Sequence, residues 1–91
     1  SLEDNEGMFF VFEKSGQYSF WMKDMNFPID IIWLSEEGQV VHMKENVATS
    51  TYPEVFTNGP SAKYVLEINA GKAKEHRLYL GTKVSIPTLT K

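Results

Sequence analysis

The chain has 91 residues, which suffices for one domain with a single core and is too short for two. It contains no cysteine, which excludes disulfides and thiolate metal sites, so stability must come from burial of the 42% of residues that are apolar. The net charge of −3 comes from scattered carboxylates and lysines, and without a basic face nucleic acid is not an expected partner.

No apolar stretch approaches the roughly 20 residues that a membrane-spanning helix needs, so the sequence predicts no insertion into a membrane. The compartment stays open. The chain begins abruptly before an acid-rich turn, and one expectation is that a signal peptide or anchor precedes it, as in an exported or periplasmic protein.

The first elements expected along the chain are two strands. Residues 8–13 form a run of aromatic and β-branched residues in which Phe10 and Phe12 share one face. A polar break at residues 14–17 precedes a second strand over residues 18–23, which places Trp21 and Lys23 on the face opposite Phe20. That second face is therefore mixed, with one apolar and one basic side chain.

The strongest strand follows a break at Pro28, which has no amide proton to donate. Residues 29–34 are apolar at both alternating sets of positions except Asp30, so both faces of this strand are expected to be buried. Glycine at position 38 indicates a hairpin over residues 36–39, and residues 40–44 return as the partner strand.

The second half of the chain is less regular. Residues 45–60 read as a long loop with one short extended piece, and residues 62–68 read as a strand. Asn69 is the expected N-cap of a short helix that ends near His76, and residues 78–86 are expected to be a last extended segment, interrupted by Gly81. The fold class predicted is mainly β, an antiparallel sandwich or open barrel with one short helix, forming a single domain over residues 1–91.

Three segments, "EGMFFVFE", "FWMKDMNFPIDIIWL" and "AKYVLEINAGKA", are similar to those of the domain of unknown function 192 family. The resemblance spans nearly the whole chain. It is carried by Gly7, Met8, Phe10, Phe12, Phe20, Trp21, Met22, Lys23, Pro28, Asp30, Gly38, Tyr64, Val65, Leu66, Glu67, Asn69, Ala70, Gly71 and Gly81.

The resemblance implies a jelly-roll-like β fold and no particular activity. It also implies an N-terminal strand and short helix upstream of the first residue, which this chain lacks, so an exposed sheet edge is expected. The chain departs from the family pattern after the helix, where it has His76-Arg77-Leu78, and again at Gly81-Thr82.

Charged residues inside the apolar strands are the first candidates for a functional site. Lys23, Asp30 and Glu67 have strongly apolar neighbours, and the resemblance includes the same three residues. One interpretation is a buried ion-pair cluster that fixes strand register, and this is the commoner use of such residues. The other is a polar cluster that binds a ligand, with Lys23 holding a ligand carboxylate or hydroxyl.

Aromatic residues near the proline break are the second group of candidates. Trp21 beside Lys23 offers an apolar wall next to a hydrogen-bond donor, although in so small a domain aromatic residues more often belong to the core. The candidate ligand-binding residues are therefore Trp21, Lys23, Asp30 and Glu67, with the loop over residues 45–60 as a rim.

Three functions stay open, and the sequence does not decide whether the protein is an enzyme. We favour a non-catalytic binding module for a small polar ligand or a partner segment. The alternatives are a small hydrolase-like enzyme that uses Asp30 and Glu67 as paired carboxylates, and a structural or interaction domain. No cofactor or metal is predicted, because neither His42 nor His76 has a second histidine at metal-binding spacing. The oligomeric state also stays open.

Overall fold

The computed structural model describes residues 7–17, 19–21, 27–48, 55–57 and 61–85. Within these ranges the chain forms six strands and one short helix. The elements are β1 (Gly7–Gly16), β2 (Ser19–Trp21), β3 (Ile29–Leu34), β4 (Val40–Val47), β5 (Val55–Thr57), β6 (Ala62–Asn69) and α1 (Lys72–Glu75).

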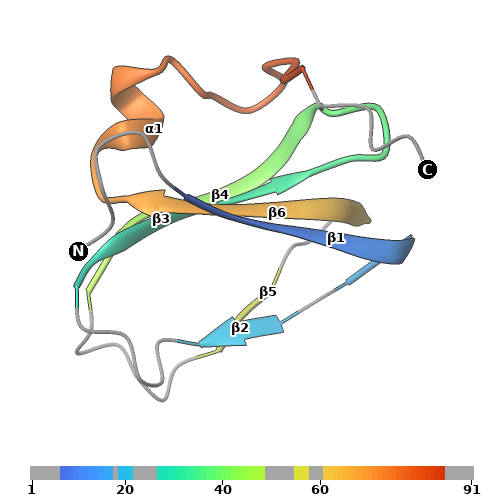
Figure 1. The fold of residues 1–91 in the computed structure, drawn as a ribbon, viewed down its shortest axis with the longest axis horizontal. Helices are drawn as coiled ribbons and strands as arrows, with labels where there is room; N and C mark the ends of the chain where they lie inside the picture. Colours follow the sequence, from blue (N-terminus) through green and yellow to red (C-terminus); the bar gives the residue numbers. More distant parts are fainter. Residues whose placement is uncertain (1–6, 18, 22–26, 49–54, 58–60, 86–91) are drawn as a thin grey trace.

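The strands form two antiparallel sheets. Four of them pair in the order β1-β6-β3-β4, and β2 pairs separately with β5. In Figure 1 the β2–β5 pair lies on one side of the four-stranded sheet, and α1 lies on the other side. The prediction of a mainly antiparallel β fold with one short helix is confirmed. The sandwich or barrel closure and the jelly-roll connectivity stay predictions.

β3 lies inside the four-stranded sheet, between β6 and β4, and all six of its residues are buried. Because side chains alternate along a strand, β3 contributes to a core on each face. Ile29, Ile31 and Trp33 pack with Val65 on the face toward β2 and β5, whereas Ile32 and Leu34 pack with Ile68 and Ala73 on the face covered by α1. We call the second of these the helix face.

The hairpin predicted between β3 and β4 is confirmed. The Gly38 amide donates to the Ser35 carbonyl at 2.9 Å, and the Ser35 amide donates to the Gln39 carbonyl at 2.8 Å. Gly38 has a φ of 89°, a conformation that side chains other than glycine rarely adopt. β4 continues to Val47, so the predicted loop begins later than position 45, and β5 supplies its short extended piece.

The structure corrects the predicted polar break at residues 14–17 and describes only part of the strand predicted over residues 18–23. β1 extends to Gly16 through most of the expected polar break, and its pairing with β6 shifts register between Val11 and Gly16. β2 covers residues 19–21 of the expected second strand, and positions 18, 22 and 23 lie outside the described residues.

The prediction that Asn69 caps the helix is wrong. Asn69 is the last residue of β6 and pairs with Ile29, so its backbone continues the sheet. The N-cap position of α1 is Gly71, which has a φ of 93° and no side chain to cap with. α1 has four residues, and no helix among the described residues is long and apolar enough to cross a membrane.

The prediction of an extended segment over residues 78–86 is also wrong for the described part, residues 78–85, although the interruption expected at Gly81 is present. The Thr82 amide donates to the Tyr79 carbonyl at 2.9 Å, which closes a turn, and Gly81 has a φ of 88°. The chain then contacts the start of β4 through the isolated bridge between Gln39 and Lys83. This segment therefore folds back over the sheet beside the edge strand β4.

Candidate functional site

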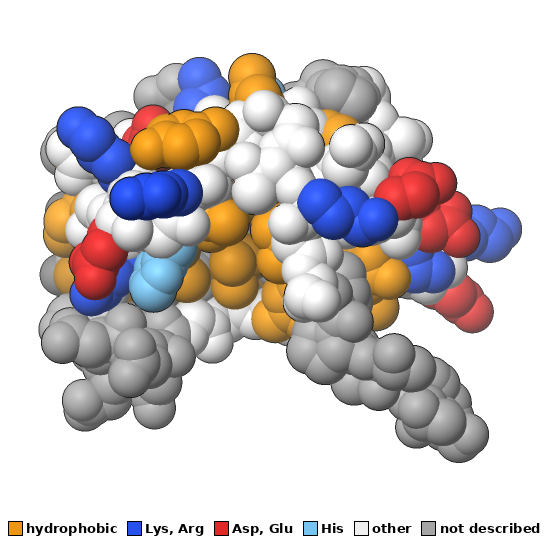
Figure 2. Space-filling view, turned by 90° about the horizontal axis from the view of Figure 1, so that it is seen from above, with side chains coloured by type: hydrophobic (Ala, Val, Ile, Leu, Met, Phe, Trp, Pro, Cys, Tyr) orange, Lys and Arg blue, Asp and Glu red, His pale blue; other side chains and the backbone are white. Residues whose placement is uncertain are grey.

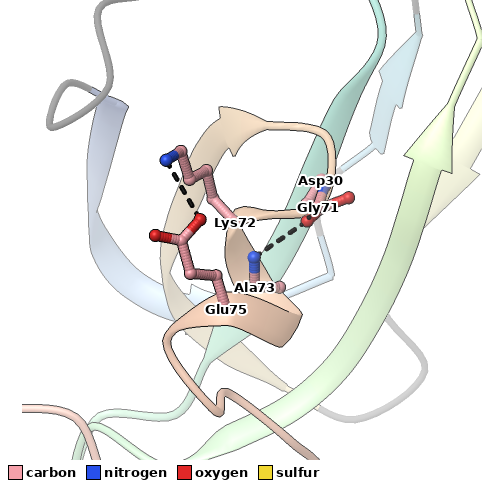
Figure 3. A network of polar contacts seen from close by, with 5 residues as sticks. All are labelled: Asp30, Gly71, Lys72, Ala73 and Glu75. Carbon is pink, nitrogen blue, oxygen red and sulfur yellow. Dashed lines mark hydrogen bonds and ion pairs between the residues drawn. The ribbon is translucent and has the colours of Figure 1, made fainter.

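Asp30 is the more deeply buried of the two charged residues that lie in the core of the described structure. It lies on β3, and none of its surface is accessible to solvent. Its Oδ1 accepts a hydrogen bond from the Asn46 amide at 2.7 Å, and its Oδ2 accepts from the amides of Gly71 and Ala73, each at 3.0 Å. Figure 3 shows the carboxylate directed at the first turn of α1. A buried carboxylate needs such donors, because burying one without hydrogen bonds is very unfavourable.

These three hydrogen bonds join three separate segments. Asn46 lies where the pairing of β4 with β3 shifts register, and it has a φ of 54°, a conformation that asparagine tolerates better than most residues. Gly71 and Ala73 belong to the start of α1. Asp30 therefore holds the irregular part of β4 and the start of α1 against the central strand, and it occupies the amides at the start of that helix.

Glu67 lies on the opposite face of the sheet from Asp30. In the ladder between β3 and β6, Asp30 is opposite Ile68 and Ile31 is opposite Glu67. Directly opposed residues share a face, and neighbours along a strand do not. The expectation that Asp30 and Glu67 meet in one cluster is therefore wrong, and the sheet separates the two carboxylates that a hydrolase mechanism would have to bring together.

Glu67 is buried, with 7% of its surface exposed. Burial raises the pKa of its carboxyl above the usual value, because removal from water disfavours the charged form. Among the described residues, no group is seen to donate a hydrogen bond to this carboxyl. Its cross-strand neighbours are Ile31 and Met8, which are both apolar.

The other two predicted ligand-binding residues are placed only in part. Trp21 is the last residue of β2, where its backbone pairs with Val55. Lys23 lies outside the described residues. Of the four candidates, Asp30 and Glu67 therefore lie on different faces of the sheet. A role of Lys23 beside either of them stays a prediction.

Two neighbouring clefts border β4. The first has a volume of about 420 Å³ and is lined by Asp30, Glu45, Asn46, Ala70, Gly71 and Lys74; we call it the Lys74 cleft. The second has a volume of about 370 Å³ and is lined by His42, Met43, Glu45, Tyr79 and Leu80; we call it the Tyr79 cleft. Glu45 borders both, so the two clefts adjoin each other. Both volumes lie in the range of about 300–1,000 Å³ typical of small-molecule sites.

The charges of the Lys74 cleft are exposed and opposite. Glu45 and Lys74 both lie at the surface, and the described residues include no ion pair between them. On the same helix Lys72 and Glu75 do pair, at 3.1 Å (Figure 3). Figure 2, which looks onto the helix face, shows hydrophobic side chains in the middle of this surface with basic side chains to both sides.

The Tyr79 cleft is more apolar. Tyr79 and Leu80 are 53% and 70% exposed, the highest values among the large hydrophobic residues that the structure describes. His42 stacks at a tilt on Trp33, with ring centroids 5.0 Å apart, and burial, followed by the charge of Lys44, lowers the pKa of its imidazole. The lowered pKa favours the neutral form of the ring, so His42 adds little positive charge to this cleft.

Sequence reasoning missed Lys74, Tyr79 and Leu80 as site residues and assigned Glu45 only to a loop. The signals in the sequence were weak: an asparagine suited to positive φ after Glu45, and two adjacent apolar residues in a polar stretch. In the part of the chain that is described, no three His, Cys, Asp or Glu residues are grouped so that they could hold a metal ion.

Comparison with solved structures shows two similar proteins. A protein of unknown function from Novosphingobium aromaticivorans DSM 12444 matches with a TM-score of 0.83 and 29% identity over 94% of this chain. A candidate transcription regulator from Sinorhizobium meliloti 1021 matches with a TM-score of 0.83 and 26% identity over 89% of this chain. The matches cover 61% and 62% of those proteins, so this chain spans about three fifths of their length.

No curated protein matches this chain. The family model of DUF192, described as an uncharacterized ACR, matches residues 1–86. With nearly the whole sequence covered by that model, the chain belongs to the DUF192 family.

Proposed function

We propose that this domain is a non-catalytic binding module that takes up a small polar ligand in the Lys74 cleft. The observation that carries the proposal is the pair of exposed, opposite charges, Glu45 and Lys74, which border one cleft without pairing with each other. The volume of about 420 Å³ suits a small molecule, and specificity in such sites comes from a few well-placed polar groups.

The cleft has walls held in place before any ligand arrives. Asp30 anchors Asn46 on one side and Gly71 and Ala73 on the other, through hydrogen bonds of 2.7 to 3.0 Å. A site whose walls are already ordered loses less conformational entropy on binding. Asp30 thus supports the proposal as a positioning residue, and Trp21, Lys23 and Glu67 stay predicted ligand-binding residues.

Chemical-shift mapping of backbone amides tests the proposal. The domain is titrated with a panel of sugars, amino acids, nucleotides and small amines. We expect one class to shift residues 45–46 and 70–74 together, and Lys74→Gln to remove the response. Glu37→Gln, which changes an exposed carboxylate in the β3–β4 turn, serves as the matched control and keeps the response. If no compound shifts these residues, the Lys74 cleft is not a binding site.

A second candidate, an interaction domain that pairs with another copy of itself, is favoured by β1. Met8, Phe9, Phe10 and Val11 are 36–46% exposed on this outermost strand of the four-stranded sheet. Val11→Lys should then lower the mass measured by sedimentation at high protein concentration. A mass that is that of one chain at every concentration contradicts this candidate.

We also propose that the strands have a jelly-roll-like arrangement. The position of the β2–β5 pair across one face of the four-stranded sheet supports it.

A further inference from the structure

We infer that the ligand of the Lys74 cleft is a free α-amino acid with an apolar side chain, an inference that rests on the proposed function and names its ligand class. Glu45 binds the α-ammonium group, Lys74 binds the α-carboxylate, and the side chain enters the adjoining Tyr79 cleft.

The two charges are the first argument. Glu45 and Lys74 border the same cleft, yet they form no ion pair within the described structure, whereas Lys72 and Glu75 nearby do. A ligand that carries both an ammonium and a carboxylate group satisfies both side chains at once. A ligand with only one charge leaves the other side chain of the cleft without a partner.

The carboxylate end is assigned to Lys74 because the amides of α1 are already used. Gly71 and Ala73 donate to Asp30 Oδ2, so the start of the helix is occupied by a carboxylate of the protein itself. A ligand anion placed there would find no free donor at these two amides and would lie close to Asp30. Lys74 is the cation that borders the cleft, and it lies on α1 directly after Ala73.

The same charges argue against a nucleotide or sugar phosphate. Two carboxyl-bearing residues, Asp30 and Glu45, and a single lysine line the Lys74 cleft. Phosphate sites normally surround the anion with several cations or free amides, whereas this cleft has one lysine in its lining and its Gly71 amide already donates to Asp30. A zwitterion carries no net charge and matches this mixed lining better.

The apolar end is the second, independent argument. Tyr79 and Leu80 are largely exposed, and Met43 completes an apolar lining on the far side of Glu45. Because Glu45 borders both clefts, an ammonium group bound to it has the Tyr79 cleft beside it. An aliphatic or aromatic side chain on the same ligand would cover Tyr79 and Leu80, which water covers otherwise.

Calorimetric titration of the full chain with leucine and three analogues tests the inference. Isoamylamine lacks the carboxylate, isocaproate lacks the ammonium group, and glycine lacks the side chain. We expect leucine to bind and each analogue to bind at least about tenfold more weakly, since one charge-assisted hydrogen bond or one buried side chain is lost. AMP and glucose complete the panel.

Matched variants then assign each group. Glu45→Gln should weaken leucine binding without weakening isocaproate, and Lys74→Gln should weaken leucine binding without weakening isoamylamine. Glu37→Gln and Lys83→Gln change exposed charges away from the clefts and should leave leucine binding unchanged. If both control variants bind leucine as the wild type does, the loss of binding in the cleft variants does not come from a change in overall charge.

The outcomes separate the inference from the proposed function. If AMP or glucose binds and needs Lys74, the cleft is a binding site and the amino-acid inference is overturned. A leucine-containing dipeptide that binds as tightly as leucine also overturns it, because its two charges lie further apart. If nothing in the panel binds, both the inference and the proposed function fail.

Discussion

Replacing Asp30 with alanine removes three hydrogen bonds at once and should strongly destabilise the fold. The Ala73 amide is buried, and the Asn46 and Gly71 amides are partly buried. A hydrogen bond to a charged acceptor contributes about 1.5–3 kcal/mol, and water can compensate the two partly buried donors to some extent. We therefore expect a loss of about 3–5 kcal/mol in the free energy of unfolding.

That loss is large against the whole stability of a domain of this size, about 5–14 kcal/mol. Urea denaturation followed by circular dichroism measures it, with Glu37→Ala as a control that should change the free energy by less than about 0.5 kcal/mol. Asp30→Asn keeps one oxygen acceptor and should fall between the wild type and Asp30→Ala. A loss below about 1 kcal/mol for Asp30→Ala would refute the role assigned to this carboxylate.

Substitutions at three further positions test other parts of the structure. Because burial raises the pKa of Glu67, the folded state holds its proton more tightly than the unfolded state, so the free energy of unfolding should fall as pH rises above about 4.5. Glu67→Gln should remove most of that fall in urea denaturation between about pH 4 and 7, and an unchanged slope would contradict it. Gly7→Ala places a β-carbon 2.7 Å from Ile68 Cγ2 and 2.9 Å from the Glu67 carbonyl oxygen, so thermal unfolding should show a loss of about 1–3 kcal/mol. Gly71→Ala meets no neighbouring atom within 4 Å, and a loss of about 1–2 kcal/mol should come from its φ of 93° alone; Gly71→Asn should lose less.

The parts of the fold that depend on local pattern could be predicted from the sequence. The unbroken apolar run of β3 indicated burial on both faces, and glycine at position 38 indicated the hairpin to β4. Both features are set by residues within a few positions of each other, where side-chain alternation and backbone freedom decide the structure.

The candidate site could not be predicted in the same way, because it depends on register between distant strands. Alternation tells which neighbours within β3 share a face with Asp30, and which within β6 share a face with Glu67. Whether the two carboxylates share one face of the sheet depends on the register between the strands, and a shift of one residue reverses the answer. The observed pairing of Asp30 with Ile68 places the two carboxylates apart.

The start of α1 could not be predicted from local sequence either. Asn69 is the residue that a local reading selects as the cap, whereas the acceptor that the Gly71 amide uses belongs to Asp30, 41 positions away. Glu45 and Lys74 likewise border one cleft because Asp30 holds β4 and the start of α1 against the same strand. No pattern within either segment contains that information.

The order of the four-stranded sheet has a consequence for how the chain folds. Among its described strands, β3 and β4 alone are neighbours both in the chain and in the sheet, whereas β1 pairs with β6, with all the other strands between them in sequence. Contacts between distant segments form slowly, because the chain must close a long loop first. During synthesis the aromatic strand β1 leaves the ribosome before its partner exists. It must wait for residues 62–69, and this waiting period is when we expect the chain to be most prone to aggregation and most dependent on chaperones.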